Sequence, residues 1–488
     1  SGGGDTGSVN KNTAGLQSDH DRALCACPLL RFLANRATTS VELATLLHWY
    51  LTVETEDTKM GLHFTRILDI VARTLKSAGG ALGREIGKSI IAQQALVDRL
   101  RATLAHAIGT KRSATEKKVA KLRQALQPGG FAEDLLKVDV VLPLDTSLRL
   151  TGIVPDTARM FASATYPMAL EWYTQPSAIG DAGDAGKSDK TKQGSAAEFS
   201  AKGVDAAAST PRSRDSLGSD VDGEDMGTAD VHDARRLSAG SLASIQNESM
   251  RMVHAFFQPQ PKVKFVYKGG DDMRQDQLVI QLIGLIDRLF KRVNLDLRLT
   301  PFKVISTSRN DGLMEFVDGA LTISKILKDY GKNIQQFFRQ HHPAPAPAKY
   351  GINPEVMETF IRSSAGYCVI TFVLAIGDRH LENLMIKPTG HLLHIDFGWI
   401  FGRDPKPWPS PMRLIPQMVA AMGGSESEDY ARFKLYCCQA YHIMRSNAKL
   451  ICNLLSLMAD ADIKDLSVEQ DAAAVILKVQ DRLRLDLV

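Results

Sequence analysis

Two short polar clusters in the C-terminal part of the chain carry side chains suited to the chemistry of a metal-bound nucleotide. The first contains Asp378, Arg379, His380 and Asn383, and the second begins at Asp396 of an Asp-Phe-Gly triplet. The amide oxygen of Asn383 and the carboxylate of Asp396 are ligands for a hard cation that keeps water and phosphate oxygens as its other ligands. Mg²⁺ bound to ATP fits this description, and Mn²⁺ is a possible substitute. His380 is the first candidate for a general base because histidine titrates near neutrality, with Asp378 as its orienting group or substitute, and Arg379 more plausibly braces the loop.

The segment between the clusters predicts a β-hairpin that brings the two metal ligands together. Residues 384–386 and 392–395 are short apolar runs, and Thr389-Gly390 between them is typical of a tight turn. The open end of this hairpin would then carry both ligands. The plain alternative is a polar turn beside a core hairpin that happens to contain Asp-Phe-Gly. The joint presence of both clusters and the hairpin favours the metal site.

A lysine at the end of a predicted strand forms a second candidate centre. Lys268 closes the apolar run 265–268, and Asp272 with Gln275 three residues later predicts a helix start of the capping-box kind. Asp276 would then lie on the first turn and face Lys268. In kinases, a strand lysine contacts the ATP phosphates and an acidic residue on the neighbouring helix orients it. A lone strand lysine is more often solvent-facing, but the downstream metal pattern favours the catalytic interpretation.

These motifs together resemble a known family of enzymes. The reversed Asp-Arg-His triplet at 378–380 and His-Ile-Asp-Phe-Gly at 394–398 resemble the phosphatidylinositol 3-/4-kinase superfamily. The following loop, GRDPKP at 402–407 and PSPM at 409–412, is similar to the activation loop of class III phosphatidylinositol 3-kinases, the vacuolar-sorting and autophagy lipid kinases. The resemblance implies transfer of the ATP γ-phosphate to the 3-hydroxyl of phosphatidylinositol, for endosomal and vacuolar trafficking and autophagy.

The same resemblance implies partners, a location and nucleotide contacts. The implied partners are phosphatidylinositol in membranes, a regulatory kinase-like subunit and a beclin-type coiled-coil subunit, and the implied location is cytoplasmic, peripheral on endosomal, vacuolar or autophagic membranes. A loop around Ser163 resembles the phosphate-covering loop, although a plain β-turn fits it equally well. Glu315, Phe316 and Val317 correspond to the hinge that contacts adenine, and Ile395 to an apolar contact of the nucleotide.

The loop after Asp-Phe-Gly indicates the charge of the lipid headgroup. It contains Arg403, Lys406 and Arg413, separated by prolines. An inositol ring that carries further phosphates needs several clustered cations for charge-assisted hydrogen bonds. We therefore expect plain phosphatidylinositol as the substrate. Trp399 and Trp408 are candidates for insertion at the lipid interface, and core positions are an equal alternative for both.

The expected fold class is α+β: a bilobal protein-kinase-like catalytic domain, with a β-rich N-lobe and a mostly helical C-lobe, preceded by an α-helical accessory (PIK) domain that the resemblance implies. We predict a disordered tail at 1–20, the C-terminal part of the helical domain at 21–137, and the N-lobe at 138–317. Residues 176–260 within the N-lobe have low hydrophobicity and predict a disordered insertion. The C-lobe covers 318–488 and is expected to stop before the terminal helix of the family.

Composition excludes several other classes. The length of 488 residues predicts two to four domains, and 44% hydrophobic residues are enough to form their packed cores. The formal net charge of +4 is too small to indicate nucleic-acid binding. The six cysteines include no Cys-x-x-Cys pair, which indicates reduced thiols rather than a zinc site. Two other functions stay open: a protein kinase of the same superfamily, and a non-catalytic scaffold that acts through the helical region alone.

Overall fold

In the computed structural model, the N-terminal helices form where apolar residues recur at three- and four-residue intervals. The structure describes residues 27–109, 114–179, 260–408, 410–468 and 471–486. The expected disordered tail at 1–20 lies outside these ranges.

Helix α3 shows how the helical region is held together. Its N-cap is Ser40, whose hydroxyl accepts the N–H of Leu43 (3.3 Å). Trp49 on α3 is fully buried and donates its indole N–H to Gln93 of α5 (3.1 Å). Apolar packing and a buried polar contact therefore join these two helices. The helices of this region are α2 (Pro28–Ala37), α3 (Val41–Glu54), α4 (Gly61–Ser77), α5 (Gly80–Ile108) and α6 (Thr115–Ala125).

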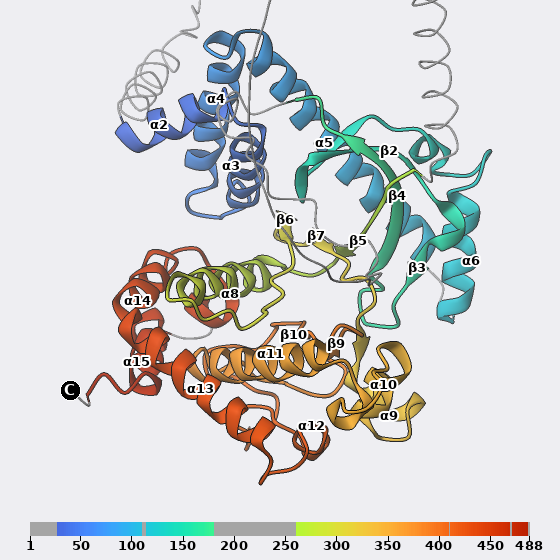
Figure 1. Cartoon of the computed structure of the whole chain (residues 1–488). Helices are drawn as coiled ribbons and strands as arrows, with labels where there is room; N and C mark the ends of the chain where they lie inside the picture. Colours follow the sequence, from blue (N-terminus) through green and yellow to red (C-terminus); the bar gives the residue numbers. More distant parts are fainter. Residues whose placement is uncertain (1–26, 110–113, 180–259, 409, 469–470, 487–488) are drawn as a thin grey trace, which may run out of the picture. The chain divides into compact units, whose positions relative to one another are not determined.

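An antiparallel sheet follows, with the strand order β1-β2-β4-β5-β7-β6 and β3 paired to β4 (Figure 1). β4 and β5 pair directly although about 85 residues separate them in the sequence, with Met168 opposite Tyr267. The strands are β1 (Val140–Leu142), β2 (Asp145–Ile153), β3 (Arg159–Met160), β4 (Met168–Pro176), β5 (Lys262–Gly269), β6 (Val304–Ser308) and β7 (Asp311–Glu315).

The two faces of β5 pack against different helices because side chains alternate along a strand. Phe265 and Tyr267 belong to the core that contains α5, whereas Val266 belongs to the core that contains α8 (Arg274–Arg292). Lys268 lies two residues after Val266 and therefore points to the same face of the strand. The strand therefore presents its terminal lysine on the face that α8 covers.

The C-terminal part is mostly helical, and its longest helix, α11, is buried along nearly its whole length. A three-stranded sheet in the order β10-β9-β8 packs against it. The combination of this part with the antiparallel sheet confirms the α+β class. The remaining elements are β8 (Leu321–Thr322), α9 (Ile323–Asp329), α10 (Ile334–His341), α11 (Pro354–Val373), β9 (Leu384–Ile386), β10 (Leu392–His394), α12 (Pro416–Ala421), α13 (Glu428–Ser446), α14 (Ala448–Leu457), a π-turn (Lys464–Val468) and α15 (Ala472–Arg482).

The first residues of the expected insertion are part of the described structure. Pro176 still belongs to β4, and Ser177 donates its backbone N–H to Ser147 (2.8 Å). Ile179 is buried in the same apolar core as Val141 and the helices α2 to α4. Residues 176–179, at the edge of the expected insertion, therefore pack with the N-terminal core, because Ile179 is an apolar side chain within the low-hydrophobicity stretch. Residues 180–259 lie outside the described ranges.

None of the helices that the structure describes is long and apolar enough to cross a membrane.

Candidate active site

The predicted hairpin is confirmed and is built on α11. β9 and β10 pair with Leu384 opposite His394, and the Ile395 N–H donates to the Asn383 carbonyl (3.0 Å). The turn needs Gly390, which has φ of 91° and a position where a Cβ would lie 2.1 Å from the Val356 carbonyl of α11. This hydrogen bond closes the end of the hairpin, so Asn383 and Asp396 lie at the same end of it.

The side chains of Asn383 and Asp396 suit a hard cation. Asn383 is 5% exposed, and its amide nitrogen donates to the Asp378 carbonyl (3.0 Å), which leaves the amide oxygen as the atom available to a ligand. Asp396 is exposed, and one of its oxygens accepts the Gly398 N–H at 3.3 Å. One amide oxygen and one accessible carboxylate form a partial oxygen shell of the kind that Mg²⁺ or Mn²⁺ completes with phosphate and water.

Arg379 lies underneath this pair and holds the backbone on both sides of it. Its guanidinium donates to the carbonyls of Gly377 (2.7 Å), Ile395 (2.8 Å) and Asp396. Burial lowers the pKa of Arg379 to about 10, against the attraction of Asp396 and other nearby carboxylates. With all three carbonyls bound, the side chain is placed to brace the loop rather than to reach a substrate.

Lys268 lies on the α8 side of β5, among acidic side chains. Its ammonium is 3.6 Å from the Asp271 carboxylate. Burial disfavours the ammonium, but nearby carboxylates outweigh this effect and leave the pKa of Lys268 above its ordinary value. These carboxylates are, in order of effect, Asp276, Asp271 and Asp396. Lys268, Asp276 and Asp396 therefore lie close enough for the two carboxylates to stabilise the charge of the lysine.

Asp276 has a second partner that the sequence did not indicate. Its carboxylate accepts the backbone N–H of Phe397 (2.9 Å), the residue after Asp396. Burial raises the pKa of Asp276, Lys268 opposes this, and Asp396 adds to it. The ion pair of Lys268 within 4.0 Å is with Asp271, which sequence reasoning missed. A signal was present, since Asp271 lies three residues after the lysine.

The predicted helix start is confirmed, since α8 begins at Arg274, but Asp272 and Gln275 do not form a capping box there. Asp272 accepts the backbone N–H of Arg274 (3.1 Å), not that of Gln275, and the N-cap residue is Met273 without a side-chain cap. The Gln275 amide instead donates to the Phe397 carbonyl (2.9 Å). The pattern misleads because a stronger tertiary partner takes the side chain that would otherwise turn back on the helix.

The two candidates for the general base lie side by side. The Nε2 atom of His380 is 3.8 Å from a carboxylate oxygen of Asp378, and the imidazole is about half exposed. The Nδ1 atom of His380 accepts the N–H of Glu382 (3.2 Å), so a neutral ring carries its proton on Nε2. Asp378 is itself positioned through its backbone N–H, which donates to Asp404 (2.7 Å).

The nucleotide contacts expected from the resemblance fall on two loops. Ser163 is exposed in the loop between β3 and β4, and the neighbouring Thr165 lies close to Gly270 at the end of β5. Glu315 ends β7, and its side chain accepts the Lys303 N–H (2.9 Å). The Phe316 N–H donates to the Lys264 carbonyl (3.3 Å). The loop at 161–167 thus lies near the strand that carries Lys268.

The remaining expected contacts are backbone positions beside these elements. Val317 follows β7 and is half-buried, and its carbonyl accepts the Ala320 N–H at 3.3 Å. Ile395 joins β10 to Asp396 and is likewise half-buried.

The three expected substrate-loop cations are in different situations. The guanidinium of Arg403 lies 3.4 Å from the buried Asp465 carboxylate and over the ring of Trp399, so an internal partner holds it. Lys406 has an exposed side chain. Arg413 is half-buried, and its carbonyl faces the Cys368 thiol (3.9 Å). The three cations therefore differ in their exposure and in their partners.

The two tryptophans also differ. Trp399 is half-buried between Arg403 and Lys464, whereas Trp408 is 91% exposed. Of the two, only Trp408 has the exposure that contact with a lipid surface requires.

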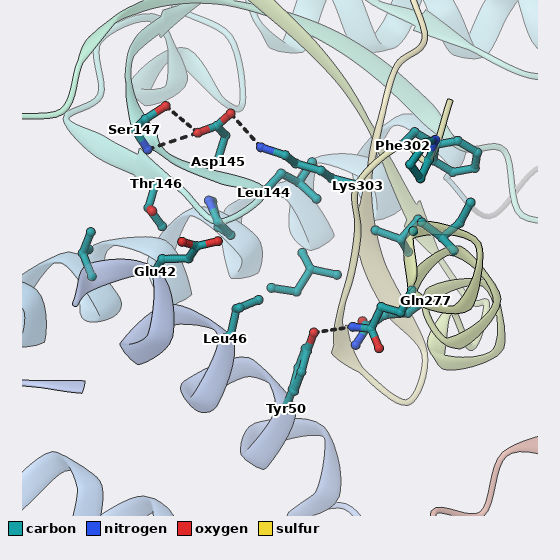
Figure 2. Close-up of a pocket in the computed structure, with 18 of the residues that line it drawn as sticks. Glu42, Leu46, Tyr50, Leu144, Asp145, Thr146, Ser147, Gln277, Phe302 and Lys303 are labelled. Carbon is teal, nitrogen blue, oxygen red and sulfur yellow. Dashed lines mark hydrogen bonds and ion pairs between the residues drawn. The ribbon is translucent and has the colours of Figure 1, made fainter. Parts of the chain in front are cut away.

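A separate pocket of about 830 Å³ lies between α3, the β1–β2 turn, α8 and β6 (Figure 2). Tyr50 accepts a hydrogen bond from Gln281 (2.5 Å) at one end, and Lys303 pairs with Asp145 (2.7 Å) at the other. None of the described residues that line it is an expected catalytic, metal or nucleotide residue. This pocket is therefore distinct from the candidate active site.

Comparison with known proteins shows what the chain that carries this site is similar to. Residues 262–468 match the family described as phosphatidylinositol 3- and 4-kinase. The matched range contains β5, α8, the hairpin and the loop after it, so a kinase-like bilobal arrangement fits the sheet and helices described above. A domain of this family uses ATP with a divalent cation.

Similarity extends beyond the kinase domain. The chain is 35% identical over 466 residues to a nodule isoform of phosphatidylinositol 3-kinase from Glycine max, across 94% of this chain and 46% of that protein. It is 33% identical over 465 residues to phosphatidylinositol 3-kinase VPS34 of Arabidopsis thaliana, with the same two shares. Over 222 residues, 46% of this chain and 25% of the relative, it is 45% identical to VPS34 of Saccharomyces cerevisiae. The chain spans about half the length of the relatives that it matches along 94% of its own length.

Proposed function

We propose that this chain is the catalytic part of a phosphatidylinositol 3-kinase, which transfers the γ-phosphate of ATP to the 3-hydroxyl of phosphatidylinositol. The observation that carries the proposal is the convergence of Lys268, Asp276 and Asp396 inside a domain of the phosphatidylinositol 3- and 4-kinase family. Relatives named phosphatidylinositol 3-kinase share 31–46% identity with the chain, which supports the choice of the inositol lipid and of the 3-position.

The nucleotide would bind between Lys268 and the end of the hairpin. Asn383 and Asp396 would hold Mg²⁺, or Mn²⁺ in its place, through the free amide oxygen and the exposed carboxylate. When bound there, such a cation would supply neutralisation of the charge that develops on the transferred phosphoryl group. The ammonium of Lys268 stays protonated because carboxylates surround it, so it can bind a phosphate oxygen. The loop at Ser163 and the hinge at 315–317, with Ile395, would complete the nucleotide contacts.

Proton removal from the inositol hydroxyl would fall to the pair His380 and Asp378. To act as a base at Nε2, the neutral imidazole must first give up its Nδ1 contact with the Glu382 N–H, a partly exposed hydrogen bond of 3.2 Å. The Asp378 carboxylate beside Nε2 would then stabilise the ring once it is protonated. Asp378 can alternatively take the proton itself, since its carboxylate is partly exposed.

The headgroup is proposed to be plain phosphatidylinositol. Arg403 is held by Asp465 and Trp399, so the exposed Lys406 is the cation of the loop that is best placed to meet a headgroup. One accessible lysine suits the single phosphodiester of phosphatidylinositol and is too little for two additional ring phosphates.

We further propose that the chain works at the surface of endosomal, vacuolar or autophagic membranes, with the exposed Trp408 as a contact. The helices α2 to α6 would be the C-terminal part of a PIK accessory domain. A kinase-like regulatory subunit and a beclin-type coiled-coil subunit are the proposed protein partners.

The test is a lipid-product assay with ATP, Mg²⁺ and liposomes that contain either phosphatidylinositol or its 4,5-bisphosphate. We expect phosphatidylinositol 3-phosphate from the first liposomes and much less product from the second. Asp396→Asn should abolish turnover, whereas Asp460→Asn, a change of the same chemistry at an exposed position, should not. Equal or faster turnover of the bisphosphate would refute the substrate assignment.

The same assay separates the alternatives. Phosphorylation of a protein without lipid would indicate a protein kinase of this superfamily. A chain whose cellular function survived Asp396→Asn would act as a scaffold.

A further inference from the structure

Three consecutive residues at the start of α8 are buried and bind partners outside this helix. Arg274 pairs with Glu54 of α3 (3.6 Å) and donates to the carbonyls of Ala461 (2.9 Å) and Asp462 (3.1 Å). Its two neighbours, Gln275 and Asp276, bind the Asp-Phe-Gly segment. The first turn of α8 therefore contacts the helical region, the C-terminal segment and the Asp-Phe-Gly segment at 396–398.

Gln275 and Asp276 between them hold both backbone groups of Phe397. Asp276 accepts its N–H and Gln275 donates to its carbonyl, each at 2.9 Å. On the other side of the same peptide bond, Arg379 donates to the Asp396 carbonyl. Asp396 has φ of 60°, a left-handed conformation that non-glycine residues adopt only when their surroundings impose it. These anchors therefore set the backbone from which the metal-ligand carboxylate projects.

The Gln275 amide is itself held by a residue 190 positions away. Asp465, in the π-turn after α14, is fully buried. Its backbone N–H donates to the Gln275 amide oxygen (3.0 Å), and its carboxylate accepts from the Gln275 amide nitrogen (3.1 Å). This reciprocal pair fixes which end of the amide points at Phe397, because the oxygen is bound to a donor and the nitrogen to an acceptor.

The Asp465 carboxylate also reaches the loop that follows Asp-Phe-Gly. The oxygen that accepts from Gln275 also accepts the backbone N–H of Ile400 (2.8 Å), and the other oxygen faces Arg403 at 3.4 Å. The buried Asp465 carboxylate is thus linked to Phe397 through Gln275, and it contacts Ile400 and Arg403 of the following loop directly. An amide at this position could still accept both N–H groups through its one oxygen, but its NH2 group would face Arg403 where the carboxylate has its second oxygen.

We infer that Asp465 and Gln275 are positioning residues for the metal-binding carboxylate of Asp396. This inference rests on the proposed function, because it assigns a role in metal and nucleotide binding. The two residues act by holding the Phe397 carbonyl and the Ile400 N–H, and so the conformation of the segment between them. Removal of an outer-shell partner of this kind lowers metal affinity by about 10- to 100-fold.

The experiment measures binding rather than turnover, using Mg²⁺ and a non-hydrolysable ATP analogue with the full chain. Nucleotide binding is titrated by calorimetry at increasing Mg²⁺ for the wild type, Asp465→Asn and Gln275→Met. We expect each variant to need about 10-fold more Mg²⁺ for half-maximal binding. The double variant should show no greater shift than either single variant, because both changes break one chain of contacts.

Asp460→Asn is the matched control, since it is the same change at an exposed position of the same segment and should leave the titration unchanged. Thermal unfolding of every variant shows that it is folded, and Gln275→Met tests the inference if Asp465→Asn fails to fold. A purely structural role would lower the unfolding temperature without altering the Mg²⁺ requirement, and that result would overturn the inference. Failure of the wild type to bind the nucleotide at any Mg²⁺ concentration would overturn the proposed function itself, and this inference with it.

Discussion

Replacement of Asp276 by Asn separates what this residue does for stability from what it does for catalysis. The carboxylate is 5% exposed, accepts the Phe397 N–H at 2.9 Å and faces Lys268. Loss of its charge weakens that hydrogen bond by about 1 kcal/mol and removes an attraction to Lys268 of up to about 3 kcal/mol. It also removes the several kcal/mol, roughly 3 to 5, that burial of an ionised carboxylate costs. The opposing effects nearly cancel, so the free energy of unfolding should change by no more than about 1 kcal/mol at neutral pH.

The pH dependence of this variant has a definite sign. Because burial raises the pKa of Asp276, the folded protein binds its proton more tightly than the unfolded chain does. Asp276 therefore stabilises the fold below its unfolded pKa, and this contribution is lost as the pH rises through the raised value. Asp276→Asn lacks this loss, so its stability relative to the wild type should increase as the pH rises from the unfolded pKa of an aspartate through the raised folded value. Urea unfolding at several pH values measures the difference.

Activity should fall although stability does not. Without the Asp276 charge, Lys268 is drawn toward Asp271, and we expect kcat/KM for lipid phosphorylation to drop about 100-fold, or about 2.7 kcal/mol of transition-state stabilisation. Asp271→Asn is the control, since this carboxylate is about half exposed and should affect unfolding by less than about 0.5 kcal/mol. A loss of more than about 3 kcal/mol in the stability of Asp276→Asn, or activity within twofold of the wild type, would refute this reasoning.

Three further predictions concern other parts of the chain. Arg379→Lys cannot hold three carbonyls at once, so urea denaturation should show a loss of about 2–4 kcal/mol together with loss of lipid phosphorylation. Trp408→Ala removes a side chain that is 91% exposed, so the melting temperature should stay constant while co-sedimentation with phosphatidylinositol liposomes decreases; unchanged co-sedimentation would argue against a lipid contact. Burial lowers the pKa of His48 to about 4, so the wild type should lose stability as the pH falls from about 6.5 toward 4, and His48→Phe should flatten this slope in a thermal-shift series.

The parts of the site that sequence reasoning recovered are those built from short-range patterns. The hairpin follows from two apolar runs and one glycine, and the strand period of two places Lys268 on the α8 face of the sheet. The α+β class follows from alternating and helical periodicities in different parts of the chain. In these cases the residues that decide the structure lie within about one element of each other, so the physical cause is visible in a short stretch.

The sequence by itself determined which side chains are candidates to hold a cation and a phosphate, and on which strand, hairpin and helix they lie. Only the tertiary structure decided their partners. From the sequence, we expected Arg403 to serve the substrate loop, but in the structure it pairs with Asp465. We expected Gln275 to help begin a helix, but its side chain binds the Phe397 carbonyl. The physical reason is that a buried polar side chain must find a partner wherever packing provides one. For Gln275, one such partner is Asp465, which lies 190 residues away in the sequence.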